Sequence, residues 1–299
     1  MKNWTIMLRH QPVLAQETFE HLPQNLHLYF DGTFWHGGHC EYFLTHLSEE
    51  KAKNLKVLAC DIDAEVQKKG LEFTKQWSPQ ITPVLSSYAK IKEIFQQYGK
   101  MDFMLLDLGV NMEHFKDGER GFSIKYDAPL DMRFNRTNEV SAETIVNTYS
   151  LEKLSDLFSL YGDFSEKTAE YLAKGIIEER KKKKITTTWE LKEILYNLKC
   201  NQKKIAVIFQ ALRIETNKEL DQLHTFLADF GECLTIWGRC AIMTYHSIED
   251  RIVKLAFKKL EETWLFQLVN KKVIKPTYLE VQKNKAARSA KLRIIEKIK

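Results

Sequence analysis

The segment Leu28-Tyr-Phe-Asp-Gly-Thr-Phe-Trp-His-Gly-Gly-His-Cys40 decides the fold of this chain. Its apolar beginning predicts a buried strand that ends at Asp31, and residues 41–47 have the apolar spacing of a helix. Glycines stand between the two, as is needed where a backbone adopts positive φ or approaches a ligand closely. This order is typical of the first unit of a nucleotide-binding α/β sheet. A plain structural turn is the alternative, because the glycine spacing is not G-x-G-x-x-G.

The next unit favours the interpretation as a cofactor loop. Residues 55–60 predict a second strand, and Asp61 follows it directly. An acidic residue at the tip of the second strand can hold a ribose by its two hydroxyls. Further strands are predicted at residues 80–85 and 101–107, and helices at 64–77 and 91–98. The resulting order βαβαβαβ predicts a doubly wound parallel sheet.

Tyr88 and His246 each follow a predicted strand. The loop after the third strand often contacts an adenine, so Tyr88 is a candidate for that contact, with a buried tyrosine of no function as the alternative. His246 follows a strand predicted at residues 239–245 and therefore lies at the carboxyl edge, where α/β sites are built. A structural histidine is the alternative. Ser247 is the predicted N-cap of the next helix.

The region between Gly109 and about residue 204 contains no predicted buried strand. Its pattern is that of amphipathic helices at residues 141–148, 151–161, 165–181 and 188–197. A long helix is predicted at residues 205–227. We therefore expect a helical domain at residues 111–204, inserted into a sheet domain formed by residues 1–110 and 205–299.

The composition limits the class of protein. With 299 residues, 44% hydrophobic and 28% charged, the chain can bury a large core. The net charge of +5 suits a polyanionic partner without requiring one. Its five cysteines form no C-x-x-C pair, which predicts reduced thiols in a cytosolic protein rather than disulfides or zinc ligands. No apolar run approaches the length of a membrane span, so we expect no membrane partner.

Two basic segments leave alternatives open. The run Arg180-Lys-Lys-Lys-Lys184 ends a predicted helix, where cations are favourable. Residues 270–299 are also rich in Lys and Arg. Each segment is either a solvated surface or a patch that contacts phosphates.

Several unrelated motifs carry a resemblance to a known family. The chain contains Leu105-Leu-Asp-Leu-Gly-Val110, Glu119-Arg-Gly-Phe-Ser123 and Pro129-Leu-Asp-Met-Arg133, followed by motifs at residues 209–217, 245–254 and 287–293. In this order and spacing they resemble the RsmH or MraW family of ribosomal small-subunit RNA N4-cytosine methyltransferases. The resemblance covers nearly the whole chain.

The resemblance implies a Rossmann-like methyltransferase domain that uses S-adenosylmethionine, interrupted by a helical domain that helps to recognise RNA. It implies N4-methylation of a cytidine in 16S rRNA, at the decoding-region (P-site) position. The partner would be the small ribosomal subunit, in the cytoplasm, and a homodimer is compatible with the sequence. No metal is required, because the sulfonium is already an activated methyl donor.

The family's cofactor residues carry over by position. They correspond here to Gly37, Gly38, His39, Asp61, Tyr88, Asp107 and His114. The chain departs from the family pattern at several positions: Trp35-His36 stand where Gly-Arg is usual, and His114 replaces a glutamine. Asn111-Met112 replace two serines and Lys285-Ala286 replace a Pro-Arg pair. A bulky Trp35 is expected to reshape the loop. The departures at Trp35-His36 and His114 motivate a rival hypothesis, a non-catalytic RNA-binding assembly factor of the same fold.

The reaction itself suggests further candidate residues. Cytosine N4 is a poor nucleophile because its lone pair is delocalised, so the site must hold the amine with acceptors and align it with the methyl group. Asp107 and Asn111 are the candidate acceptors, and Asp107 is held as a cofactor ligand as well. The candidates for substrate contacts, each with a structural salt bridge or cap as the alternative, are Asp131, Arg133, His246, Arg288, Lys291 and Arg293.

Overall fold

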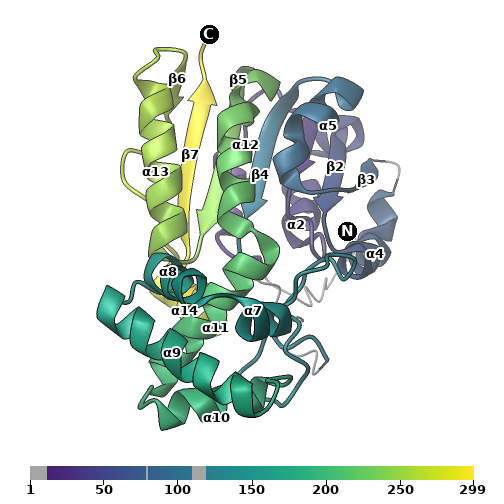
Figure 1. Ribbon diagram of the computed structural model, residues 1–299. Coiled ribbons are helices and arrows are strands. Elements are labelled where there is room, and N and C mark those ends of the chain that lie inside the picture. The colour runs from purple at the N-terminus through teal and green to yellow at the C-terminus, as the bar shows by residue number, and fades with distance from the viewer. Residues whose placement is uncertain (1–11, 79, 110–118) are drawn as a thin grey trace. The chain divides into compact units, whose positions relative to one another are not determined.

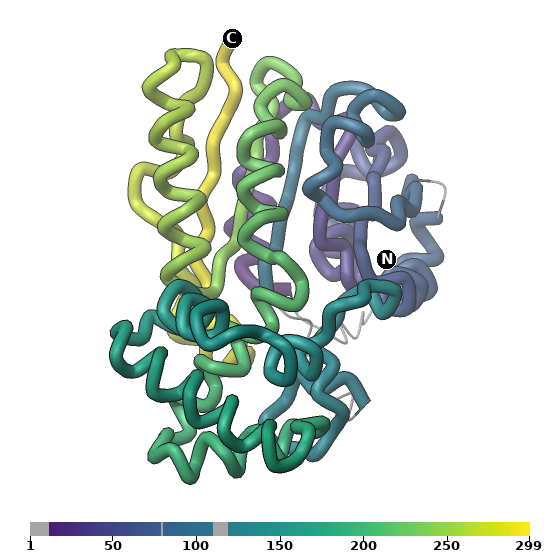
Figure 2. Tube along the Cα trace, in the orientation of Figure 1, coloured from purple at the N-terminus to yellow at the C-terminus, as the bar shows by residue number. Residues whose placement is uncertain are grey.

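The protein is described by a computed structural model that covers residues 12–78, 80–109 and 119–299. The chain divides into two compact units, one formed by Met1–Gly109 with Gln222–Lys299 and the other by Val110–Asp221. The first unit, called the sheet unit, is built from both ends of the chain. Figure 2 shows this in β4 (Met101–Asp107, blue), which lies beside β5 (Leu234–Thr244, green).

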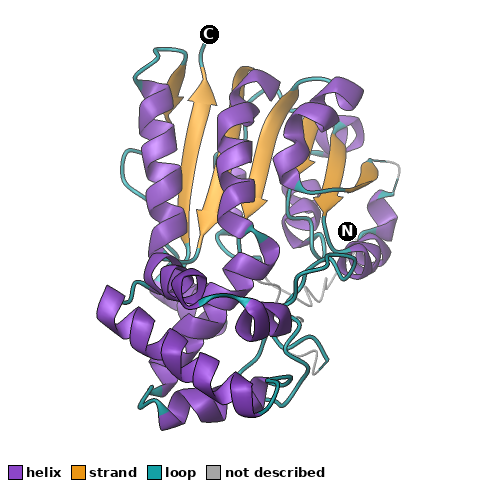
Figure 3. Ribbon diagram, viewed as in Figure 1, coloured by secondary structure: helices purple, strands orange, loops and turns teal. Residues whose placement is uncertain are grey.

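The sheet unit contains a seven-stranded sheet in the order β3-β2-β1-β4-β5-β7-β6 (Figure 3). Strands β1 to β5 pair in parallel, which confirms the predicted doubly wound arrangement. β7 pairs antiparallel with both β5 and β6, so the basic tail contributes a strand next to the edge of the sheet that the sequence pattern did not predict. The remaining strands are β1 (Leu28–Asp31), β2 (Lys56–Asp61), β3 (Ile81–Leu85), β6 (Phe266–Leu268) and β7 (Lys291–Lys297).

Helices cover both faces of this sheet. The face turned to the viewer in Figure 1 carries α5 (Ile91–Tyr98), α12 (Glu219–Cys233) and α13 (Ser247–Glu261), and α2 (Gly38–His46) lies behind it. The other helices of this unit are α1 (Ala15–Glu20), α3 (Glu49–Asn54), α4 (Ala64–Phe73) and α14 (Tyr278–Lys283), with short turns η1 (Lys75–Trp77), η2 (Tyr88–Lys90) and η3 (Lys285–Ser289).

β4 shows why the sheet needs both layers of helices. Successive side chains of a strand point to opposite faces. Met104 and Leu106 accordingly join the core under α5, α12 and α13, whereas Phe103 and Leu105 join the core under α2 and α3. A continuously apolar strand is the pattern expected of a strand buried on both faces.

The second unit, called the helical unit, has its own hydrophobic core. Its helices are α7 (Ala142–Thr148), α8 (Leu151–Gly162), α9 (Glu166–Lys182), α10 (Thr188–Asn197) and α11 (Gln202–Asn217). Side chains cap several of these helices: Ser141 and Thr187 each form a capping box, and Asn201 accepts a hydrogen bond from the N–H of Lys204.

The expected return to the sheet at residue 205 differs from the observed division, which lies between Asp221 and Gln222. α11 supplies Ile205, Ile208 and Leu212 to the core of the helical unit. The prediction of one continuous helix at residues 205–227 is wrong, because Lys218 adopts a left-handed conformation (φ 51°) and separates α11 from α12. The guanidinium of Arg213 reaches across this break and binds both carboxylate oxygens of Glu219 at 2.8 and 2.9 Å.

None of the helices in the described residues is long and apolar enough to cross a membrane. All five cysteines are free and buried. Within the same described ranges, no group of three or more His, Cys, Asp or Glu side chains is arranged to hold a metal ion.

Candidate functional site

Three acidic residues stand at the carboxyl ends of neighbouring strands. Asp31, Asp61 and Asp107 are the last residues of β1, β2 and β4, and β1 pairs with both of the other strands. Each residue is buried, with 2%, 6% and 4% of its surface exposed. Burial raises the pKa of Asp31 to about 6 and those of Asp61 and Asp107 to about 7. The edge therefore concentrates acidic groups that lack a compensating cation among the described residues.

Asp31 anchors the turn that follows β1. The hydroxyl of Tyr29 donates to its Oδ2 at 2.7 Å, and the backbone N–H of Thr33 donates to its Oδ1 at 3.4 Å. The N–H of Asp107 in turn donates to Oγ1 of Thr33 at 2.7 Å. Through these bonds Asp31 fixes the turn after β1 against the end of β4.

Asp61 holds the glycine-containing loop from the neighbouring strand. Its Oδ2 accepts the N–H of Trp35 at 2.8 Å and its Oδ1 accepts the N–H of Asp63 at 2.9 Å. Trp35 has φ 46°, so the loop keeps a left-handed conformation here although the residue is not glycine. Such a conformation costs a side chain roughly 1–2 kcal/mol, which the hydrogen bond to Asp61 offsets. Trp35 therefore adopts the same left-handed conformation that a glycine would favour at this position.

Gly37 is required by both conformation and space. It has φ 70° and is the N-cap of α2. A Cβ at this position would lie 2.8 Å from the ring of Phe34 and 2.6 Å from the methyl group of Thr74. Gly38 is the first residue of α2. The predicted loop glycines therefore lie where the chain turns from the edge of the sheet into the helix.

His39 lies within α2 and faces the acidic edge. Its Nε2 donates to the carbonyl of Val13 at 2.9 Å, which places the proton on Nε2, since a carbonyl oxygen only accepts. Burial lowers the pKa of His39, so the imidazole is neutral and Nδ1 carries a lone pair. Nδ1 lies 4.0 Å from Oδ2 of Asp107.

Asp107 is joined to a residue that the sequence analysis did not place in the site. The hydroxyl of Tyr245 donates to Oδ1 of Asp107 at 2.7 Å. Tyr245 directly follows β5 and precedes the predicted site residue His246, a position at the carboxyl edge that was available as a signal in the sequence. The structure thus adds Tyr245 to the acidic edge.

Tyr88 and His246 have different surroundings. Tyr88 begins η2 and lies beside the turn after β1, because a Cβ at Gly32 would be 3.1 Å from the Cβ of Tyr88. His246 is itself the N-cap of α13, so the prediction of Ser247 as the cap is wrong. Its Nδ1 accepts the N–H of Glu249 at 3.4 Å and its Nε2 lies 2.8 Å from Oε1 of Glu249. These are the contacts of a structural cap, the alternative considered for this histidine.

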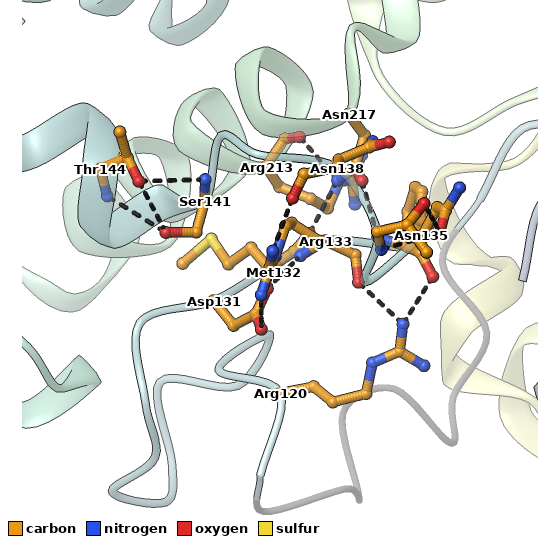
Figure 4. Close-up of polar contacts among 12 residues, drawn as sticks. Arg120, Asp131, Met132, Arg133, Asn135, Asn138, Ser141, Thr144, Arg213 and Asn217 are labelled. Atoms are coloured by element: carbon orange, nitrogen blue, oxygen red, sulfur yellow. Dashed lines mark hydrogen bonds and ion pairs between the residues drawn. The ribbon is translucent and has the colours of Figure 1, made fainter.

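Asp131 and Arg133 form an ion pair within the helical unit (Figure 4). Nε and Nη2 of Arg133 donate to the two carboxylate oxygens of Asp131 at 2.7 and 2.9 Å. Between them Met132 has φ 61° and is buried, a conformation that its surroundings must impose. Nη2 of Arg120 donates to the carbonyls of Arg133 and Phe134 at 2.7 and 2.8 Å. The motifs at residues 119–123 and 129–133 thus fold against each other.

The basic candidates are largely paired with carboxylates. Lys291 and Arg293 on β7 donate to the two oxygens of Asp250 on α13 at 2.9 and 2.8 Å. Arg288 is exposed. In the run at residues 180–184 each lysine faces a glutamate, the pairs being Lys181–Glu178, Lys182–Glu179, Lys183–Glu190 and Lys184–Glu143. These contacts correspond to the alternative of salt bridges and a solvated helix end. The candidates Asn111 and His114 lie outside the described residues.

The strand order, the glycine turn after β1 and the acidic tips of successive strands define the class of Rossmann-like methyltransferases. Comparison with known sequences identifies the group within that class. The chain belongs to the MraW methylase family, whose model matches residues 7–298.

Curated relatives match the chain over nearly its full length. It is 38% identical over 305 aligned positions to "Ribosomal RNA small subunit methyltransferase H" of Elusimicrobium minutum, which covers 100% of both chains. It is 36% identical over 296 positions to the protein of the same name from Endomicrobium trichonymphae, which covers 96% of this chain and 98% of the relative. A solved rRNA methylase from Streptococcus thermophilus has 9% identity and a TM-score of 0.44, covering 96% of this chain and 95% of its own.

S-adenosylmethionine is the cofactor of this family of methylases, and the residues at the acidic edge fit it. The cofactor carries ribose hydroxyls, an ammonium group and a cationic sulfonium. Buried carboxylates with raised pKa values are the groups that such donors and cations would stabilise in the ionised form. Lone pairs remain on these oxygens, since each carboxylate has about four acceptor sites.

Proposed function

We propose that this protein transfers a methyl group from S-adenosylmethionine to N4 of a cytidine in 16S rRNA, at the decoding-region (P-site) position. The observation that carries the proposal is the acidic edge formed by Asp31, Asp61 and Asp107 beside the turn at Gly37, in a chain whose residues 7–298 match a methylase family. The relatives named as ribosomal RNA small subunit methyltransferases support rRNA of the small subunit as the substrate.

The edge offers a distinct group for each part of the cofactor. Asp61 at the tip of β2 would accept the ribose hydroxyls with the lone pairs not used by the N–H groups of Trp35 and Asp63. Tyr88, beside the turn at Gly32, would contact the adenine. The start of α2 at Gly38 would present backbone N–H groups to a carboxylate.

The bound cofactor supplies an activated methyl group, so the task of the protein residues is positioning. Asp107 lies at the end of β4, where its carboxylate could accept hydrogen bonds from an amine. Accepting those bonds would favour the rehybridisation that frees the N4 lone pair for attack, and the displaced proton would pass to water. Asn111 remains a candidate second acceptor.

Recognition of the RNA is proposed for Asp131 and Arg133 of the helical unit and for Arg288 of the sheet unit. Asp131 and Arg133 are partly exposed and joined by two hydrogen bonds, and the planar guanidinium of Arg133 is suited to a phosphate or a base. Arg288 is an exposed cation in η3. The target base must leave its stack to reach a pocket, which suits a single-stranded segment of RNA.

The test combines cofactor binding with product analysis. Calorimetric titration with S-adenosylmethionine comes first, followed by incubation with small ribosomal subunits that lack the modification. Mass spectrometry of the 16S rRNA should then locate one added methyl group on N4 of a cytidine in the decoding region. Intact affinity for RNA without cofactor binding would instead favour the non-catalytic assembly factor.

A further inference from the structure

The two carboxylate oxygens of Asp107 have different surroundings. Oδ1 accepts the hydroxyl hydrogen of Tyr245 at 2.7 Å. Oδ2 accepts no hydrogen bond from the residues described here, and Nδ1 of His39 lies 4.0 Å from it. Because Nε2 of His39 carries the proton donated to Val13, Nδ1 is also an acceptor. Two acceptor atoms therefore face each other, and none of the residues that the structure describes places a donor between them.

Oδ2 of Asp107 and Nδ1 of His39 restrict the chemical class of a ligand group that can donate a hydrogen bond to both of them. A hydrogen bond between nitrogen and oxygen spans about 2.9 Å, so one atom can reach two acceptors that are 4.0 Å apart. That atom must carry at least two hydrogens, one for each acceptor. A ligand hydroxyl has only one, whereas an amine or an ammonium group has enough.

Tyr245 is held in place by two contacts in addition to the hydrogen bond from its hydroxyl to Asp107. Its backbone N–H donates to Oε2 of Glu249 at 2.9 Å, and Glu249 is 2% exposed. Its ring packs against Gly109, where a Cβ would lie 3.0 Å from the ring. The hydroxyl is thus held in place by its backbone, its ring and Asp107 together.

We propose that Tyr245 is a positioning residue that occupies one oxygen of Asp107, so that the other oxygen and Nδ1 of His39 together accept hydrogen bonds from an amine of the bound ligand. The inference rests on the proposed function and extends it to the atoms involved. The amine has two sources in that reaction: the ammonium group of the cofactor and the N4 amine of the target cytosine.

The pH dependence of binding provides a readout that a purely structural tyrosine would not change. Burial raises the pKa of Asp107 to about 7, and the hydrogen bond from Tyr245 opposes that rise. Among the described residues, the other charged or titratable groups that face Asp107 are His39 from α2, Glu249 from α13, and Asp31 and Tyr29 from β1. Removal of the Tyr245 hydroxyl therefore raises the pKa of Asp107 further. As the pH falls, Asp107 takes up a proton and binds an ammonium group less well, and in the variant this loss of affinity should begin at a higher pH than in the wild type.

The experiment compares wild-type protein with Tyr245→Phe by calorimetry, using two adenosine ligands. S-adenosylhomocysteine contains the amino-acid part of the cofactor, and 5′-methylthioadenosine lacks it. If the cofactor supplies the amine, the variant should bind S-adenosylhomocysteine about 10-fold more weakly, the size of one charge-assisted hydrogen bond. Its affinity for 5′-methylthioadenosine should not change. If the cytosine supplies the amine, both affinities should hold and kcat should fall at saturating cofactor.

Tyr29→Phe is the matched control, because Tyr29 is also buried and also donates to a carboxylate, Asp31, at 2.7 Å. It should leave the ratio of the two ligand affinities unchanged. Equal weakening of both ligands in Tyr245→Phe would mean a general distortion of the site and would overturn the proposal. Unchanged affinities, pH dependence and kcat would overturn it as well and would indicate only water between the acceptors. Failure of the wild type to bind either ligand would refute the proposed function itself.

Discussion

Asn217 joins α11 to the segment at residues 132–134 inside the helical unit, and its loss should be costly. Its Oδ1 accepts the N–H of Phe134 at 2.7 Å, and its Nδ2 donates to the carbonyls of Met132 and Arg213 at 2.8 and 3.0 Å. Figure 4 shows this side chain reaching from α11 to the segment that contains the Asp131–Arg133 pair. Because only 4% of the surface of Asn217 is exposed, water cannot take over its hydrogen bonds unless the surrounding structure rearranges.

The magnitude follows from the groups that Asn217→Ala would deprive of these bonds. The N–H of Phe134 and the carbonyl of Met132 would each lose a buried hydrogen bond. A buried polar group left without such a bond costs about 1–3 kcal/mol, so two groups should lower the stability of the helical unit by about 3 kcal/mol. The Arg213 carbonyl lies one turn before Asn217 within α11, so the backbone N–H of that turn remains as its donor.

Hydrogen exchange measured by mass spectrometry is the appropriate assay, because the chain has two units and a single unfolding free energy need not describe both. Protection of the α8 and α11 amides should fall in Asn217→Ala, while that of β4 and β5 should hold. Asn197→Ala, at the exposed end of α10, is the control and should change stability by no more than about 0.5 kcal/mol. A loss below about 1 kcal/mol at Asn217 would refute the role assigned to its hydrogen bonds.

Three further predictions concern the sheet unit. Asp61→Ala should weaken S-adenosylmethionine binding by about 2–4 kcal/mol through loss of charge-assisted ribose bonds, whereas the exposed Glu65→Ala should not; equal calorimetric affinities would exclude Asp61 from the site. Gly37→Ala should lower both the melting temperature and the cofactor affinity, because φ is 70° and the added Cβ meets Phe34; an unchanged protein would contradict the steric argument. Stability should also depend on pH. The folded-state pKa values of Asp31, Asp61 and Asp107 lie above their ordinary value of 3.8. The contribution of these residues to the free energy of unfolding therefore falls as the pH rises from 3.8 to about 7. Asp107→Asn should reduce the difference in melting temperature between about pH 5 and pH 7.5, and an unchanged difference would count against the raised pKa.

The local pattern of the sequence was sufficient for much of the fold. Apolar runs predicted β1 to β4 and the later part of β5, and the end of each run placed Asp31, Asp61 and Asp107 at strand tips. These inferences succeed because strand periodicity and the glycine turn depend on residues that are close in sequence. The motifs then indicated the methylase family, which the full-length comparison confirmed.

Other features depended on partners that are distant in sequence. The strand character of β7 was hidden by Lys291 and Arg293, whose charges are compensated by Asp250 on another element. The break between α11 and α12 at Lys218 interrupts an amphipathic pattern that continues on both sides. Local sequence patterns do not predict such a break, because contacts such as the ion pair between Arg213 and Glu219 form only in the folded unit.

The sequence by itself therefore determined the class of the fold, the edge that carries the acidic residues and the family. Only the tertiary structure decided which atoms of those residues are occupied. It showed that Tyr245 takes one oxygen of Asp107, that His39 presents Nδ1 to the other, and that His246 serves as a cap. The physical reason is that periodicity is a property of neighbouring residues, whereas the hydrogen bonding of a buried polar atom depends on whichever distant segment packs against it.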